Sequence, residues 1–410
     1  VKKPGGDGAL SEMVSVITQV DSLRFMAEYA KFYLENDLLE GFKIPEIRVA
    51  DALLFPDTGY VAIDTAARMR TLQNAAITAS VENEFHKFFG GTLNIQGAQN
   101  FTGSADYEYL DQDGTPWPIF FKEIKVDTGT TVGFAQIEQK DGFYLSPYFA
   151  YYGNVRFKAN RKELLFRGYT HIESSCEAVS TNWFNFQSLI DPNNILIELP
   201  EIDPDDKTKM LANGVFLAAD TVSGYAAFLS QEVSAADKQM FFANGVLFYD
   251  ESNSSYVITT PERISNSSVP DNYLRLSTID CTMYGEGEMS LGDGKSQMEI
   301  KSYGTINYDL ETDEMKLDLV IGLDFFFNGK LQERMAQLIL ENAEPEGVDL
   351  SSTTFKTFVS HSLEADDRDA FYSDIKNYGA PVKLPKELES TILLGKTTIN
   401  WTTESRSFLS

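Results

Sequence analysis

Apolar and polar residues alternate along much of the chain, most clearly between residues 90 and 172. The run Val-Arg-Phe-Lys-Ala at 155–159 is typical of a strand with one buried face and one exposed face. Clusters of Asp and Gly at 111–114, 127–129 and 141–142 separate such runs, and no helical segment lies between them. We therefore predict at least five antiparallel strands and little helix in this region, because parallel strands need helical crossovers.

The alternation resumes after residue 302, where Met315, Leu317, Leu319 and Ile321 share one face. Residues 10–35 fit either a strand or a helix, and we favour strand because the word Asp-x-Leu-x-Phe recurs at 51–55 next to a turn.

Helical spacing appears only near the C-terminus. After Asn328, a plausible N-cap, apolar residues recur at i, i+4, i+7 and i+8, and a second helix is predicted for 366–378, ended by Gly379. The apolar positions of the first of these helices are Leu331, Met335, Leu338 and Ile339.

Two sequence words recur in the chain. Ala-Asn-Gly-Val occurs around Asn213 and again around Asn244, and the Asp-x-Leu-x-Phe word occurs at Asp21 and at Asp51. Both spacings are about 30 residues, which is typical of stacked repeats. Asn-Gly between apolar runs is a turn signal, so we expect Gly214 and Gly245 in equivalent turns.

The predicted fold is all-β dominated, with stacked β repeats of the β-solenoid or β-jellyroll/sandwich type and a small helical insertion near the C-terminus. A proline-rich and acidic stretch at 199–206 interrupts the strands. We therefore expect an N-terminal β-repeat domain at 1–198, a second β-repeat domain at 199–327, and the insertion with terminal strands at 328–410. The Gly-rich words at 285–288 and 291–295 are interpreted as hairpin turns.

Charge and hydropathy narrow the classes of partner. The chain has 61 acidic and 34 basic residues, and its net charge of −27 disfavours nucleic acid. No run of about 18 apolar residues is present, so we expect no transmembrane helix. The chain begins at Val1 without an initiator Met, and we expect it to be part of a longer chain.

The sequence assigns no catalytic residue and no metal site. His86, His171 and His361 are far apart and lack metal-ligand spacing. Cys176 and Cys281 are expected to be buried free thiols, with a single bridge as the alternative in an oxidising compartment. We expect no cofactor. Calcium is a weaker possibility at two acidic turns, for which plain turns are the favoured interpretation; the candidate ligands are Asp111, Asp113, Asp203, Asp205 and Asp206.

Aromatic side chains are the better binding candidates. On an exposed sheet face they could stack on sugar rings or acyl chains, although we favour the interpretation that they fill the core. The candidates are Tyr144, Tyr148, Tyr151, Tyr152, Trp117 and Trp183.

Several words of the first half, at 49–59, 101–109 and 143–147, resemble those of very large, uncharacterised β-rich envelope proteins of Bacteroidetes-type bacteria. The rhythm of Ala-Asp words, Asn-Gly words and alternating strands is also similar to the stacked β-jellyroll repeats of periplasmic lipopolysaccharide-transport bridge proteins. These resemblances imply repetitive β modules in a bacterial cell envelope, in the periplasm or associated with the outer membrane. They assign no catalytic residue.

We therefore expect a non-enzymatic structural or binding module of a larger cell-envelope or extracellular protein, which presents an extended β surface. The expected partners are other envelope proteins, a glycan or a lipid, and the net charge favours neutral or cationic partners, or anions bridged by divalent ions. The alternative is a polysaccharide-processing enzyme, a glycoside hydrolase or lyase, on a β-helix or sandwich with a carboxylate pair in an open groove.

Overall fold

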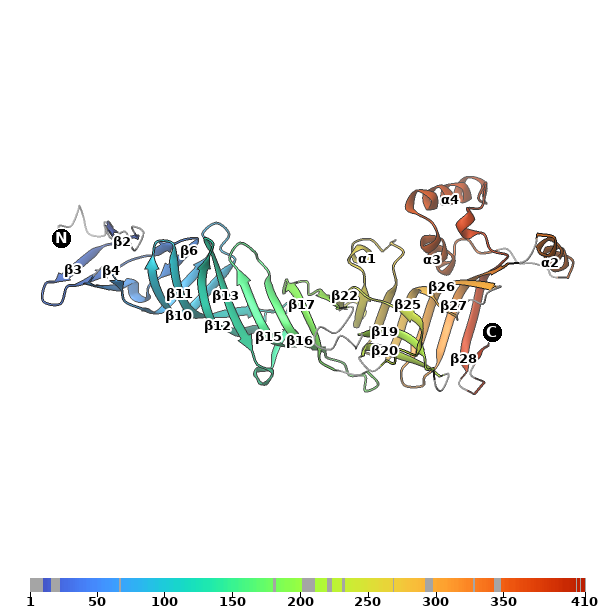
Figure 1. Cartoon of the computed structure of the whole chain (residues 1–410), viewed down its shortest axis with the longest axis horizontal. Helices are drawn as coiled ribbons and strands as arrows, with labels where there is room; N and C mark the ends of the chain where they lie inside the picture. The colour runs from blue at the N-terminus through green and yellow to red at the C-terminus, as the bar shows by residue number, and fades with distance from the viewer. Residues whose placement is uncertain are drawn as a thin grey trace. The chain divides into compact units, whose positions relative to one another are not determined.

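A computed structural model of the chain is strand-dominated and divides into two compact units (Figure 1). The first unit comprises Val1–Glu173 and Asn185–Leu196, and the second comprises Ser174–Phe184 and Ile197–Ser410. The structure describes residues 10–15, 23–65, 68–179, 182–200, 211–219, 223–230, 233–267, 269–291, 298–326, 329–342, 348–402, 404–405 and 407–409.

The first unit consists of a thirteen-stranded sheet, in which β17 is the last strand, and a four-stranded sheet with the order β3-β4-β7-β8. The strands are β1 (Ser11–Val14), β2 (Arg24–Ala27), β3 (Tyr29–Tyr33), β4 (Leu38–Phe42), β5 (Ile47–Val49), β6 (Ala52–Phe55), β7 (Val61–Asp64), β8 (Arg68–Met69), β9 (Leu72–Ala79), β10 (His86–Gly97), β11 (Asn100–Leu110), β12 (Pro116–Asp127), β13 (Thr130–Ile137), β14 (Phe143–Ser146), β15 (Phe149–Lys158), β16 (Leu164–Ile172) and β17 (Phe184–Ile190).

The strand predictions for this unit are confirmed where residues are described. Residues 90–172 contain strands β10 to β16 and one short 3-10 turn, Gln139–Asp141. The stretch that fits either a strand or a helix forms β2 and β3. The Asp-Gly clusters form turns in which Gly114, Gly129 and Gly142 have positive φ.

The thirteen-stranded sheet curls so that strands distant in its order meet. Asp51, between β5 and β6, accepts hydrogen bonds at Oδ1 from Thr131 N (2.9 Å) and Thr131 Oγ1 (2.5 Å) in β13. The rings of Phe88 in β10 and Phe157 in β15 have centroids 4.7 Å apart. Twist accumulates over many strands, and a long sheet can therefore bury its own inner face without a second layer.

The second unit is layered. Its nine-stranded sheet follows the order β18-β22-β23-β24-β25-β26-β27-β28-β29, and a separate sheet follows β20-β19-β21. The strands are β18 (Ile197–Glu198), β19 (Ala212–Leu217), β20 (Gly224–Ser230), β21 (Lys238–Phe242), β22 (Val246–Asp250), β23 (Ser255–Thr259), β24 (Tyr273–Ser277), β25 (Thr282–Met289), β26 (Met298–Asp309), β27 (Met315–Phe325), β28 (Ile392–Thr402) and β29 (Ser407–Leu409).

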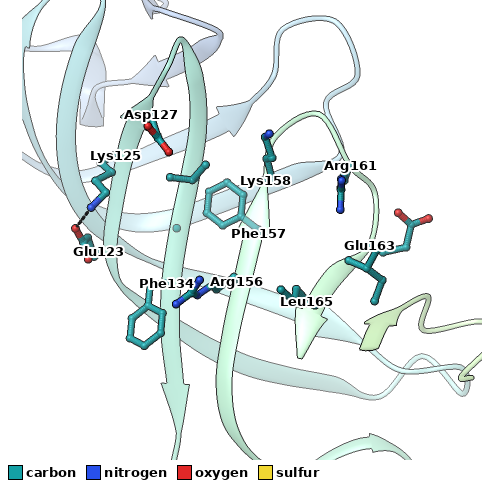
Figure 2. A pocket seen from close by; sticks show the side chains of 13 residues that line it. Glu123, Lys125, Asp127, Phe134, Arg156, Phe157, Lys158, Arg161, Glu163 and Leu165 are labelled. Atoms are coloured by element: carbon teal, nitrogen blue, oxygen red, sulfur yellow. Dashed lines mark hydrogen bonds and ion pairs between the residues drawn. The ribbon is translucent and has the colours of Figure 1, made fainter. Parts of the chain in front are cut away.

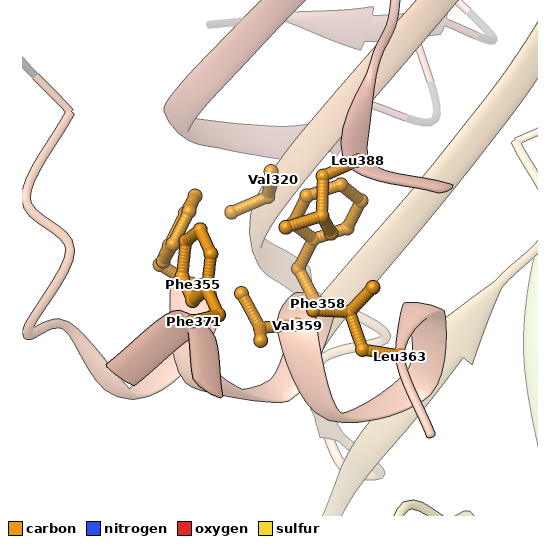
Figure 3. Packing of buried hydrophobic residues seen from close by; sticks show 7 residues of the cluster. All are labelled: Val320, Phe355, Phe358, Val359, Leu363, Phe371 and Leu388. Atoms are coloured by element: carbon orange, nitrogen blue, oxygen red, sulfur yellow. The ribbon is translucent and has the colours of Figure 1, made fainter. Parts of the chain in front are cut away.

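The two faces of the nine-stranded sheet are covered by different elements. On one face, a Cβ built on Gly285 of β25 would meet the Phe241 ring of β21 at 2.6 Å, which shows how closely the small sheet approaches. The opposite face carries α3, whose Phe355, Phe358 and Val359 pack with Val320 of β27 (Figure 3). The unit is thus a three-layer arrangement of small sheet, large sheet and helix.

Four α-helices are described, all in the second unit: α1 (Pro261–Ser265), α2 (Gly329–Asn342), α3 (Thr353–Ser362) and α4 (Ala365–Tyr378). The predicted helices correspond to α2 and to α4, which ends at Gly379 with φ 78°. Asn328, the expected N-cap of α2, lies outside the described residues. None of the described helices is long and apolar enough to cross a membrane.

The sequence predictions missed α3. Its signals are an N-cap, Ser352, whose side chain accepts from Phe355 N, and apolar residues at i, i+3 and i+4. The β-branched residues in Ser-Ser-Thr-Thr-Phe-Lys-Thr-Phe-Val masked this pattern, because Thr and Val favour strands.

Two turn predictions are wrong. Gly214 lies inside strand β19, whereas Gly245 lies in a bend before β22, so the repeated Ala-Asn-Gly-Val words do not form equivalent hairpin turns. The glycines instead allow another backbone segment to approach closely. A Cβ built on Gly214 would lie 1.9 Å from Phe241 O, and one built on Gly245 would lie 2.5 Å from Thr259 O. Gly285-Glu-Gly-Glu288 also lies within a strand, β25, and residues 292–295 are outside the described part of the chain.

The expectation of free thiols is also wrong. Cys176 and Cys281 form a disulfide within the second unit, across a sequence separation of 105 residues. The bridge joins Ser174–Phe184 to the loop before β25, and Ser175 Oγ donates to Thr278 O at 2.8 Å beside it. The bridge is the alternative given above, and whether two cysteines so far apart in sequence come within bonding distance depends on the fold.

Candidate functional site

The predicted aromatic binding residues do not form one surface. Trp117 and Tyr144 are half-buried neighbours with ring centroids 5.4 Å apart. Tyr152 stacks on Tyr169 at 5.1 Å with nearly parallel rings. Tyr148 and Trp183 are also half-buried, and Trp183 lies in the segment that belongs to the second unit.

Tyr151 is a core residue, as the favoured interpretation of these aromatic side chains predicts, and it is no longer a binding candidate. Its side chain is 1% exposed, and its ring contacts Phe166 and Phe186 edge-on at 5.0 and 5.8 Å. Its hydroxyl donates to Asn154 O at 2.8 Å. Strand alternation explains the difference, because Tyr151 and Tyr152 are consecutive in β15 and point to opposite faces.

The first acidic turn is held by its own hydrogen bonds. Asp111 is buried and accepts from Asp113 N (3.0 Å), Thr115 N (2.8 Å) and Trp117 Nε1 (3.1 Å), so its carboxylate acts as a turn cap. Asp203, Asp205 and Asp206 lie outside the described residues. Within the described ranges, His, Cys, Asp and Glu side chains form no group of three that could hold a metal ion.

The outer face of the long sheet carries a groove of about 640 Å³ that the sequence predictions did not anticipate (Figure 2). Antiparallel register builds it from two rows of side chains that cross the strands. Opposed residues on adjacent strands lie within contact distance, so each row is a continuous strip. The first row is Lys125, Val132 and Lys158, and the second is Glu123, Phe134, Arg156 and Leu165.

Side-chain length gives the groove its shape. Val132 on β13 is short, and the long side chains of Lys125 on β12 and Lys158 on β15 rise on either side of it. A register shift between Phe121 and Glu123 marks a bulge in β12, which leaves Lys122 and Glu123 both exposed. Two consecutive side chains therefore contribute to the outer face at this point.

Phe134 is the aromatic centre of the groove. Lys122 Nζ lies 4.7 Å and the Arg156 guanidinium 5.7 Å from the centroid of its ring, and Figure 2 shows Arg156 beside it. The ring face attracts cations electrostatically, so it helps to hold these side chains at the surface. Phe157, between the two exposed cations of β15, also lines the groove, but its side chain is only 3% exposed and packs against Phe121 in the core.

The charge balance of the groove differs from that of the chain. Lys125, Arg156, Lys158 and Arg161 line it against three carboxylates, those of Glu123, Asp127 and Glu163. The whole chain, in contrast, has 61 acidic and 34 basic residues. The groove is thus a locally cationic strip on an acidic protein.

Only part of this positive charge is paired. Lys125 Nζ donates to Glu123 Oε1 at 2.6 Å, and this hydrogen bond lowers the pKa of Glu123 and raises the pKa of Lys125. Lys158 and Arg161 are exposed and make no ion pair with any residue that the structure describes. Exposed, unpaired cations beside an aromatic ring can bind carboxylate, sulfate or phosphate groups.

Comparison with known proteins adds no relative: no protein-family model matches the chain, and no curated protein and no solved structure is significantly similar to it.

The groove could have been found only in part from sequence. The alternation at 155–159 already places Arg156 and Lys158 on the exposed face. Which residues of β12 and β13 lie beside them depends on register across two hairpins, and a slip of one residue would reverse every side chain. The adjacent polar pair Lys122-Glu123 is the one local signal of the bulge.

Proposed function

We propose that the chain is a non-enzymatic binding module that presents an extended β surface, with the cationic groove of the first unit as its binding face for an anionic glycan. The observation that carries this proposal is that Lys125, Arg156, Lys158 and Arg161 line one groove together with Phe134, whose ring lies beside the Arg156 guanidinium. A glycan fits because cations bind its acidic groups and an aromatic ring packs against the apolar face of a sugar.

The local charge revises the class of partner expected from the sequence. A net charge of −27 favours neutral or cationic partners at long range. Screening limits that field to about 8–10 Å at physiological salt, so an acidic chain that reaches the groove interacts mainly with the nearby cations. Repulsion by the rest of the surface would select partners whose charges are spaced to fit the groove.

The proposed setting is a larger cell-envelope or extracellular assembly. The disulfide between Cys176 and Cys281 supports an oxidising compartment, because such bridges form and persist mainly there. In this setting the second unit supplies a further module of the same chain.

Binding to a panel of polysaccharides tests the proposal. The full chain is titrated with uronate-containing, sulfated and neutral polysaccharides at low and high salt, with and without calcium, and also with anionic lipid vesicles. We expect saturable binding to an acidic polysaccharide that weakens as salt rises, because exposed charges are screened. Equal binding to neutral polysaccharides, or binding to vesicles alone, would contradict the proposal.

Variants locate the binding face. The double variant Arg156→Met with Lys158→Met should weaken binding by at least about tenfold, or about 1.4 kcal/mol. Lys162→Met is the matched control, because Lys162 is a nearby cation that pairs with Asp191 at 3.3 Å and does not line the groove. The control should bind as the wild type does.

The same assay tests the enzymatic alternative. Release of new reducing ends is measured in parallel with binding, for the wild type and for Glu163→Gln and Asp127→Asn, which remove groove carboxylates. Turnover that these variants abolish would replace the binding module with a polysaccharide-processing enzyme.

A further inference from the structure

A second polar hollow, of about 320 Å³, lies in the second unit beside α3. Its walls come from α1, β25, α3 and α4, which contribute Arg263, Glu286, Thr357, His361 and Tyr372. We call it the α3 hollow. Its size suits a molecule as large as one or two sugar rings.

The two sides of α3 have different roles. Its apolar side, with Phe355, Phe358 and Val359, packs on the sheet and on Phe371 of α4 (Figure 3). Its other side places Thr353, Thr357, Ser360 and His361 along the hollow, at i, i+4, i+7 and i+8. Because the apolar side packs α3 against the sheet, the polar side chains are not needed to hold the helix there.

A largely buried ion pair forms one wall. Arg263 Nη2 lies 2.9 Å from Glu286 Oε1, and the two side chains are 9% and 23% exposed. Glu286 also accepts from Tyr284 OH at 3.2 Å and from Thr357 Oγ1 at 3.4 Å. A buried ion pair is often no more stabilising than well-packed apolar residues, so stability alone is a weak explanation for it.

Two polar atoms of the walls have no hydrogen-bond partner. His361 Nδ1 lies 2.9 Å from Thr357 O, and since a carbonyl only accepts, Nδ1 carries the proton. Burial lowers the pKa of His361, so the ring is neutral at pH 7 and Nε2 is a bare acceptor. Nε2 and the Tyr372 hydroxyl are two of the five buried side-chain atoms without a partner in the described part of the chain.

The rim of the hollow is cationic. Lys356 is exposed there and forms no ion pair with the described residues, and Arg368 lies nearby on α4. Of the charged lining residues only Glu286 is acidic, and Arg263 already neutralises it. The hollow therefore has a lysine without an ion pair at its edge, and in its wall an acceptor, His361 Nε2, and a hydroxyl, that of Tyr372, without hydrogen-bond partners among the described residues.

We propose that the α3 hollow binds a hydroxylated anion the size of a monosaccharide, with its carboxylate or phosphate at Lys356 and a hydroxyl donating to His361 Nε2. The Tyr372 and Ser360 hydroxyls complete the site as donors to ring or hydroxyl oxygens. Both atoms are covered by neighbouring side chains, so ligand binding requires those side chains to rotate. This site is separate from the groove of the first unit and does not depend on its function.

Calorimetric titration of the full chain tests the ligand class. The probes are glucuronate, glucose 6-phosphate, glucose and inorganic phosphate, and the first two distinguish a carboxylate from a phosphate. We expect one of them to bind at least about tenfold more tightly than glucose, which lacks the anion, and than inorganic phosphate, which lacks the ring hydroxyls. Absence of saturable binding of both charged sugars at millimolar concentration would overturn the proposal.

Variants test the position of the site. Lys356→Met should weaken the bound probe by about tenfold without changing the unfolding temperature, because Lys356 is exposed. His361→Phe should remove the acceptor and also weaken binding. Lys330→Met, an exposed lysine of α2 outside the hollow, is the matched control.

The two proposed sites can fail independently. Arg156→Met in the groove should leave binding of the small probe unchanged, whereas it weakens polysaccharide binding. Wild-type affinity in Lys356→Met, or an equal loss in Lys330→Met, would show that the probe does not bind in the α3 hollow.

Discussion

In the first unit a thirteen-stranded sheet buries its inner face against itself, whereas in the second unit a nine-stranded sheet is covered by a small sheet on one face and by α3 on the other. The described helical segments of the first unit are short 3-10 turns, and all four described α-helices belong to the second. Both units are antiparallel and rich in aromatic residues, so composition alone does not explain the difference.

The difference determines what kind of site each unit can carry. In the first unit the outer face of β12, β13 and β15 stays exposed, and long side chains on it form a groove of about 640 Å³. In the second unit α3 covers one sheet face, and the hollow beside it, lined by Glu286 and His361, is about 320 Å³ against about 640 Å³ for the groove. The helix layer thus leaves a smaller polar site at its edge in place of a groove across the strands.

Truncation of a core phenylalanine should have the largest effect on stability and should distinguish the two sheet arrangements. Phe358 is 1% exposed and packs between α3 and the sheet, so Phe358→Ala should lower the free energy of unfolding by about 3–5 kcal/mol. Hydrogen exchange should rise first in α3, because the helix is a separate layer. Hydrogen exchange in strands β10 to β16 should not change in this variant.

A matched change in the first unit completes this test. Phe121→Ala should carry a similar loss, but exchange should rise together in β10 and β15, because Phe121 contacts both Phe88 and Phe157. Leu338→Ala on α2, where the side chain is 43% exposed, should change stability by less than about 0.5 kcal/mol. Loss of protection confined to one strand in Phe121→Ala would contradict the curled sheet.

Loss of the disulfide should have the next largest effect, and only in the second unit. The chain has two cysteines, both in that unit, and the bridge closes a loop across 105 positions. The variant Cys176→Ser with Cys281→Ser should therefore reduce stability by about 2–4 kcal/mol, since the unfolded chain regains the entropy of the open loop. Denaturation with and without reductant, followed by hydrogen exchange, measures this, and equal loss of protection in the first unit would contradict it.

Substitution of alanine for glycine at two positions distinguishes a glycine required by a turn from one required by close approach of another backbone segment. Gly114 in the β11–β12 turn has φ 77° with nothing within 4 Å of a built Cβ, so Gly114→Ala should lose about 1 kcal/mol. In Gly214→Ala the Cβ would lie 1.9 Å from Phe241 O and would force β19 from β21, a loss of about 2–3 kcal/mol. Thermal unfolding compares the variants, and equal losses would show that only the dihedral angle matters.

These contrasts show which features the sequence could predict. Alternation within one strand is local, and it correctly places Val155 in the core and Arg156 at the surface. The spacing of apolar residues likewise identifies α2, and Gly379 marks the end of α4. Features that depend on distant partners were missed, namely the enclosure of Gly214 and the register that aligns β12, β13 and β15. The bridge between Cys176 and Cys281 was predicted only as the alternative to free thiols.

Part of what was missed did have a local signal. Thr260 followed by Pro261, and Ser352 three residues before Phe355, are N-terminal helix signals that precede α1 and α3. Glu286, in contrast, sits in a Gly-x-Gly word that suggests a turn, and only the neighbouring sheet explains its glycines. Gly285 faces the Phe241 ring and Gly287 faces Asn272, so both positions need small residues within a strand.

The smallest expected effect concerns one histidine in each unit, His86, which is buried, and His361, which is half-buried. His86 is fully buried in the first unit and its Nε2 lies 2.7 Å from Arg161 O, while its Nδ1 has no partner; His361 in the second unit has the reverse arrangement. Burial is the main cause that lowers both pKa values below the ordinary 6.5. The unfolded chain therefore binds a proton more readily than either folded unit does.

The sign of the pH dependence follows from this difference. The stabilisation from keeping each histidine neutral is fully present above about pH 6.5 and is lost as pH falls from there toward the lowered pKa of the folded state. Hydrogen exchange at about pH 7.5 and about pH 5, corrected for the intrinsic rate, should show each unit weakening on acidification. His86→Gln should reduce that weakening in the first unit alone, and His361→Gln in the second alone. A change in both units from one substitution would mean that the stabilities of the two units are coupled, so that the two sheets could not be treated as independent.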